Sequence, residues 1–169
     1  MDHRTWLSQW RADVTAAVTS MTSTFEATHG YPPGVNEVRI ATDVDKPSSG
    51  RDGEALATYG LAAFYESIGE VVLGDVGNGY FVHSAHDVLQ RFVEEGPVVI
   101  AESERGLVFA SDGGGIQYVI DQQGAIHRST TASLDTCELD KVAHSLSEFL
   151  DLMRRLVTSF VSTGDPGYL

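Results

Sequence analysis

The sequence predicts an α+β fold, an antiparallel sheet of about five to six strands with helices packed around it. Two observations predict this fold: an amphipathic helical pattern stands near each end of the chain, and short apolar or alternating segments lie between the two. Strands grouped between helices are typical of α+β folds, whereas a parallel sheet alternates strand and helix. With 169 residues, 42% of them hydrophobic, the chain is expected to form a single domain, residues 1–169.

The two terminal helices are predicted from the spacing of apolar residues. In residues 5–27 they recur every three or four positions, and the Gly- and Pro-rich residues 29–34 end the pattern. Further on, Ser145 and Glu148 form a capping box before a second periodic segment, which predicts a helix over 146–160. The apolar positions of the two helices are Trp6, Leu7, Trp10, Val14, Ala17, Val18, Met21 and Phe25, then Leu146, Phe149, Leu150, Met153, Leu156, Val157 and Phe160.

The segments between these helices are read from alternation and turn residues. Residues 35–44 place Val38, Ile40, Thr42 and Val44 on one face of a half-buried strand. The other predicted segments are a flexible loop (45–53), helices (56–68, ended by Gly69, and 84–92), strands (71–73, 80–83, 98–101, 107–110, 116–120 and 125–128), an irregular polar segment (130–140) and a C-terminal tail (161–169).

A hairpin is predicted at the centre of the chain, where the strands 107–110 and 116–120 flank the glycine-rich residues 111–115. Three successive glycines allow positive φ angles or close backbone approach, so a bend or bulge is expected there. A phosphate cradle is the alternative reading. It is disfavoured because such a loop normally opens a helix and has a lysine nearby, whereas this loop opens a strand and contains Asp112.

Charge gives the first indication of function. The chain has 24 acidic and 11 basic residues, a net charge of −13 and a pI near 4.6. Such a chain repels nucleic acid and anionic lipid, and it favours a basic protein partner, although solubility alone would also explain the excess. We expect the partner to contact acidic residues at strand ends and turns, namely Asp43, Asp45, Asp75, Glu102, Glu104 and Asp112.

Location and redox state are predicted from what the sequence lacks. It has no apolar run of about 18 residues and no apolar segment of a secretory signal near its start. Cys137 is the only cysteine, which excludes an internal disulfide and suits a reducing compartment. A cytoplasmic protein is therefore expected.

Catalytic patterns are weak. His83 and His86 have a His-x-x-His spacing that could hold a metal, but no third ligand is evident nearby. There is no Gly-x-Ser-x-Gly elbow, and Cys137 lacks the local signature of an activated thiol. We therefore predict a protein without enzymatic activity, without a catalytic residue and without a cofactor or metal.

Trp6 and Trp10 lie on one side of the first helix and are expected in the core; an exposed pair would instead mark a partner surface.

Four segments, in order, resemble the SMI1/KNR4 (SUKH) superfamily: residues 64–70 (FYESIGE), 79–83 (GYFVH), 109–121 (FASDGGGIQYVID) and 142–150 (VAHSLSEFL). The resemblance covers about residues 56–153, and residues 5–44 are expected to pack on this core. It implies an antiparallel sheet surrounded by helices. Bacterial members resemble immunity proteins, which bind and block a toxin domain of a polymorphic toxin system. Fungal members are regulatory adaptors of endogenous partners, which is the alternative function.

Overall fold

The computed structural model describes residues 2–46, 50–134, 138–167 and 169, and it confirms the α+β class. Among these described residues, eight strands form one antiparallel sheet, more than the five to six that were predicted. The elements are α1 (His3–His29), β1 (Asn36–Ile40), α2 (Arg51–Thr58), α3 (Ala62–Tyr65), β2 (Ile68–Leu73), β3 (Tyr80–Val82), α4 (Ala85–Glu95), β4 (Val98–Ala101), β5 (Glu104–Asp112), β6 (Gln117–Asp121), β7 (Ile126–Ser129), β8 (Leu139–Ala143) and α5 (Leu146–Thr163).

The strand order is β1-β2-β3-β5-β6-β7-β8, and β4 also pairs with β5. Residues 104–106 of β5 pair with β4 and residues 110–112 pair with β3, so these two short strands share one edge of β5. The predicted central hairpin is confirmed as β5 and β6, with a register shift between Val108 and Ala110. This irregularity bends the sheet beside the glycine-rich loop.

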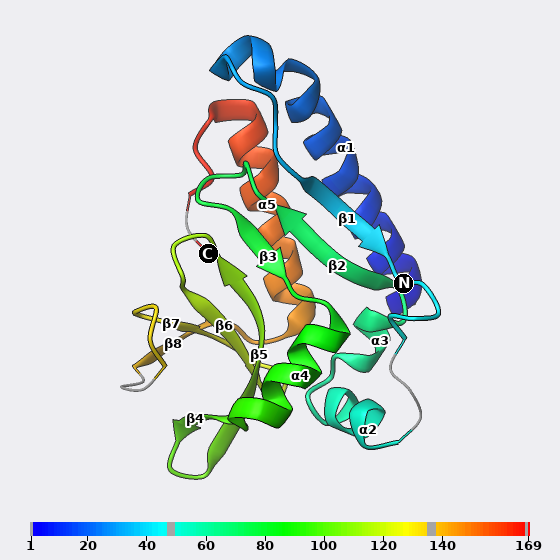
Figure 1. Cartoon of the computed structure of the whole chain (residues 1–169), viewed down its shortest axis with the longest axis vertical. Helices are drawn as coiled ribbons and strands as arrows, with labels where there is room; N and C mark the ends of the chain where they lie inside the picture. The colour runs from blue at the N-terminus through cyan, green and yellow to red at the C-terminus, as the bar shows by residue number, and fades with distance from the viewer. Residues whose placement is uncertain (1, 47–49, 135–137, 168) are drawn as a thin grey trace.

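Helices α1 and α5 pack against each other and lie behind strands β1–β3 in Figure 1. Their apolar stripes form the main core together with the facing side of the sheet. The Phe149 ring of α5 contacts the rings of Phe109 and Tyr118, with centroids 5.5 and 5.1 Å apart. Trp10 is only 2% exposed and its Nε1 donates to the Leu150 carbonyl at 2.6 Å, which confirms it as a core residue.

The predicted helix over 56–68 is wrong. Helix α2 ends at Thr58, and Gly60 follows with a φ of +72°, a left-handed conformation that is typical of a helix C-terminus. A single turn, α3, follows, and β2 already begins at Ile68, so Gly69 lies inside a strand. The apolar residues of this segment are buried by two short elements, which apolar spacing over a few residues does not distinguish from one helix.

The predicted strand over 35–44 is wrong at its C-terminal end, because β1 ends at Ile40. Ile40 is 55% exposed and Val44 is 94% exposed, so the two do not share a buried face with Val38. The cause is a turn in which the Asp45 carboxylate accepts the backbone N–H of Thr42 at 2.8 Å. This bond reverses the chain before the alternation can continue.

Strand β8 begins at Leu139, inside the segment 130–140 that was predicted to be irregular, and extends beyond it to Ala143. It is an edge strand that pairs only with β7 among the described residues, and Asp140 and Lys141 are exposed on it. A short, charged edge strand lacks the apolar alternation used for prediction. Cys137 and the rest of 135–137 lie outside the described residues, as do 47–49 of the predicted flexible loop; that loop's residues 51–53 begin α2.

The last helix is longer than predicted, and the helices can also be compared with the length that a membrane span requires. Helix α5 continues to Thr163, so the predicted tail is shorter than 161–169. Within the described part of the chain, none of the helices combines the length and the apolar character that crossing a membrane requires.

Candidate partner-binding surface

The six acidic residues predicted to contact a partner do not form one cluster. They lie in four turns or strand ends that are far apart in the sequence. Asp43 and Asp45 follow β1, Asp75 lies in the β2–β3 turn, Glu102 and Glu104 belong to the β4–β5 hairpin, and Asp112 ends β5. In Figure 1 the β2–β3 turn and the β4–β5 hairpin lie at opposite ends of the sheet, so the carboxylates of these two loops do not belong to one cluster.

Three of the six carboxylates stabilise turns, and one of them is the Asp45 carboxylate in the turn after β1. The Asp75 carboxylate accepts the Gly34 N–H at 2.7 Å and the Asn36 side-chain amide at 2.5 Å, which ties the start of β1 to the end of β2. Asp112 Oδ1 accepts two backbone N–H groups of the turn that follows it, each at 2.9 Å. Local hydrogen bonds of this kind explain why acidic residues occupy these turns without invoking a partner.

The other three loop carboxylates differ in their exposure and in their partners. Asp43 is exposed and pairs with Lys46 at 2.6 Å, and Glu102 is exposed at the tip of its hairpin. Glu104 is half-buried beside Asp121 and His127. Exposed pairs such as Asp43–Lys46 contribute little to stability, and Asp43 remains accessible to a basic partner.

The glycine-rich loop is packed against the β2–β3 turn. A Cβ on Gly113 would lie 1.9 Å from the Asn78 carbonyl oxygen, and Gly115 has a φ of +89°. By contrast, a Cβ on Gly114 would approach the Asp112 side chain at 3.3 Å, and Gly114 has no positive φ. Close approach and backbone conformation therefore account for two of the three glycines.

A different set of residues meets on the side of strands β1–β3 that faces away from α1 and α5, towards the viewer in Figure 1. Val38 pairs with Val71, and Val71 with Val82, and all three are buried on the helix side. Because side chains alternate along a strand, their neighbours point to the opposite side. We call this side the front face; its residues are Glu37, Arg39, Glu70, Val72, Phe81 and His83, with Asp87 of α4 at its border.

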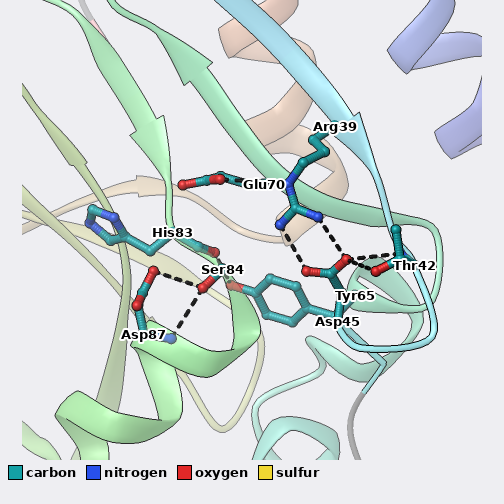
Figure 2. Close-up of polar contacts among 8 residues, drawn as sticks. All are labelled: Arg39, Thr42, Asp45, Tyr65, Glu70, His83, Ser84 and Asp87. Atoms are coloured by element: carbon teal, nitrogen blue, oxygen red, sulfur yellow. Dashed lines mark hydrogen bonds and ion pairs between the residues drawn. The ribbon is translucent and has the colours of Figure 1, made fainter.

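Arg39 is the cation of the front face, and it is held in place. Figure 2 shows its guanidinium bound through two nitrogens to the Asp45 carboxylate, at 2.7 and 2.8 Å. Glu70 Oε2 lies 3.7 Å from Arg39 Nε. The bonds from Arg39 and Thr42 hold the pKa of Asp45 well below its usual range. The guanidinium also covers Gly69, where a Cβ would lie 2.7 Å from a guanidinium nitrogen.

The junction of β3 and α4 forms the other border of the front face. The buried Tyr65 hydroxyl donates to the His83 carbonyl at 2.8 Å, and the Ser84 hydroxyl caps α4 by accepting the Asp87 N–H at 3.2 Å (Figure 2). Burial, together with Arg91, lowers the pKa of His83 against the opposing effect of Asp87, so the imidazole is uncharged at neutral pH.

The front face is therefore acidic. Glu37, Glu70 and Asp87 carry negative charge, His83 is neutral, and the charge of Arg39 is balanced by Asp45. Val72 and Phe81 lie half-buried among these groups. An apolar centre surrounded by charged groups is typical of a surface that binds protein. The strands 71–73 and 80–83 were predicted from the sequence, but the register that joins them was not.

His83 and His86 do not form the metal pair that their spacing allowed. His83 is half-buried on the front face, whereas His86 is exposed on α4. In the described residues, neither belongs to a group of three side chains that could hold an ion.

Comparison with known proteins adds no relative: no protein-family model matches the chain, and no curated protein matches it significantly. The resemblance to the SMI1/KNR4 superfamily thus stays a prediction from the four motifs, and the surface has to be interpreted from its own chemistry.

Proposed function

We propose that this chain is a non-enzymatic protein-binding module, an immunity protein that neutralises a cognate toxin domain of a polymorphic toxin system by occluding it. The observation that carries the proposal is the front face, where apolar and acidic side chains lie on an ordered sheet that the chain's own helices leave uncovered within the described residues. The motif resemblance supplies the toxin as the class of partner.

Charge supports a basic partner. The chain carries a net charge of −13, and the front face adds exposed carboxylates at Glu37 and Asp87 without a free cation of its own. Complementary charge accelerates the encounter of two proteins and discriminates against acidic competitors. Half-buried Phe81 and Val72 supply apolar area at the centre of the contact, where binding energy is concentrated.

The fixed positions of the front-face side chains also support the proposal. Arg39 is fixed by Asp45 and Glu70, and the β3–α4 junction is fixed by Tyr65 and by the Ser84 cap. Because these side chains are held before a partner arrives, less conformational entropy is lost on binding. A rigid sheet surface suits an inhibitor that binds tightly by covering its target.

The test is co-expression of this chain with toxin domains encoded beside its gene. Survival of cells that produce both proteins, and death of cells that produce the toxin domain alone, is the expected result. If this chain protects against none of the neighbouring candidates, the immunity function is wrong. Capture of a stoichiometric endogenous protein from unchallenged cells would then support the regulatory adaptor function.

A further inference from the structure

We propose that Glu104, Asp121 and His127 bind a divalent transition-metal ion such as Zn²⁺. These residues are separate from the front face and play no part in the partner binding proposed above. Their donor atoms, one from each side chain, all lie within 4.8 Å of one another. The set combines two carboxylates with one imidazole, which are ordinary protein ligands of zinc.

The sheet register brings the three residues together. Asp121 pairs with Gly106, two residues after Glu104 on β5, and His127 of β7 pairs with Val119, two residues before Asp121 on β6. Residues two apart on a strand share a face, so all three side chains emerge on the same side of three adjacent strands. This is the side opposite to α5, whose Phe149 contacts the other face.

The Asp121 carboxylate is already oriented. Its Oδ1 accepts the N–H groups of Gln123 and Ala125, each at 2.9 Å, and its Oδ2 lies 2.8 Å from His127 Nε2. Second-sphere hydrogen bonds of this kind commonly fix a metal-binding carboxylate. Oδ2 is therefore directed towards His127 and Glu104, while Oδ1 holds the turn.

The spacing of the donor atoms suits a small ion. With zinc–ligand bonds of about 2.0–2.2 Å, tetrahedral ligand atoms lie about 3.4 Å apart. The observed separations run from 2.8 Å between Asp121 and His127 up to the 4.8 Å limit that includes Glu104. To bind an ion, the Asp121 and His127 donor atoms have to move slightly apart, and the Glu104 carboxylate has to move towards them. The Glu104 side chain can rotate because it is only half-buried.

Burial and charge favour a cation at this position. Asp121 is 1% exposed and His127 is 5% exposed. The Asp121 carboxylate lies beside a second carboxylate, that of Glu104. Two such groups repel each other, and a divalent cation between them stabilises both.

The ligand set and its surroundings indicate the class of ion. One imidazole nitrogen and two carboxylate oxygens suit Zn²⁺, Mn²⁺ or Fe²⁺, and the set has no thiolate to favour a softer ion. His127 would bind through Nε2 after its ring proton moves to Nδ1. A hollow of about 290 Å³, lined by Glu104, Arg105, Gln122 and Gln123 among others, opens beside Glu104.

The test is zinc titration of the chelator-treated protein by calorimetry, with Glu104→Gln as the test variant and Glu102→Gln as the matched control on the same hairpin. Glu104→Gln removes one ligand at a half-buried position, so folding should survive. We expect one ion per chain for the wild type and for Glu102→Gln, and an affinity at least about tenfold lower for Glu104→Gln. Zinc should also raise the melting temperature of the first two proteins more than that of the third.

Cobalt substitution gives a second readout. Co²⁺ in a site of this kind should produce visible absorption bands that weaken in Glu104→Gln but not in Glu102→Gln. Absence of saturable binding, or zinc affinity in Glu104→Gln equal to that of the wild type, would overturn the proposal. In the second case zinc would be bound elsewhere, for example at exposed histidines, and Asp121 and His127 would be only a hydrogen-bonded pair.

Discussion

The two faces of strands β1–β3 carry different kinds of side chain, although side chains along each strand point alternately to one face and the other. The helix-side face has Val38, Val71 and Val82, which are buried against α1 and α5. The front face has charged and half-buried groups, with Arg39 and Glu70 next to one another across the strands. Burial explains the first set completely. The second set is half-buried or exposed, so burial does not explain its composition, and the proposed partner binding would. Substitutions on the two faces should therefore have different effects.

The largest effect on stability is expected on the helix side. Phe149→Ala removes a fully buried ring that contacts Phe109 and Tyr118, so the free energy of unfolding should fall by about 3–5 kcal/mol. Urea denaturation measures this change. The fraction that remains folded should bind the partner with wild-type affinity, because Phe149 does not reach the front face.

The next largest effect is expected in the glycine-rich loop. Gly113→Ala places a methyl group against the Asn78 carbonyl and should destabilise the protein by about 1–3 kcal/mol. Gly114→Ala is the control, because its Cβ meets only a side chain at 3.3 Å and its φ is not positive. Equal melting temperatures for the two variants would show that close packing does not explain this loop.

A smaller, pH-dependent effect is expected at the border of the front face. Asp45→Asn weakens the ion pair with Arg39 and should lower the free energy of unfolding by about 1–2 kcal/mol at neutral pH. The folded-state pKa of Asp45 lies below its ordinary value of 3.8, so its contribution is present above that pH and is lost as the pH falls towards the folded-state value.

Urea titrations of wild type and Asp45→Asn between neutral pH and about pH 3 measure this difference. The gap in stability between the two proteins should narrow towards acid. A gap that stays constant with pH would mean that Asp45 acts through packing and not through its charge.

The smallest effect on stability is expected at the centre of the front face. Phe81→Ala removes a half-buried ring and should lower the free energy of unfolding by about 1 kcal/mol. Partner affinity should fall much more, by at least about tenfold, since aromatic residues at interface centres are frequent hot spots. Calorimetry or surface plasmon resonance with the captured partner compares the affinities of the wild type and Phe81→Ala. An unchanged affinity would place the contact elsewhere.

Long periodic elements were predictable from sequence because their own residues determine them. The stripes of α1 and α5, and the strands on either side of Gly113, are local patterns. The errors at residues 56–68 and at β8 fall on short segments whose own residues do not determine one type of element. The error at the end of β1 has a local cause, the Asp45 carboxylate, which turns the chain by binding Thr42 and Arg39.

The candidate surface was harder to predict for the same reason. Acidic residues in loops were predicted to contact a partner because exposed charges seldom stabilise a fold. Asp75 and Asp112, however, stabilise turns through backbone hydrogen bonds. Glu70 and Phe81 lie on strands, and their proximity to Arg39 and Val72 depends on register. Local sequence identifies the side of a strand on which a residue lies, but it does not identify the neighbouring strand.

The most direct test of the central claim compares two triple variants with equal loss of charge. The front-face variant combines Glu37→Gln, Glu70→Gln and Asp87→Asn; the control combines Glu26→Gln, Glu54→Gln and Asp140→Asn, none of which lies on the front face. Association with the captured partner is measured at low salt. We predict an association rate at least about tenfold lower for the front-face variant and close to wild type for the control. Equal rates for the two variants would contradict the assignment of the front face as the partner-binding surface.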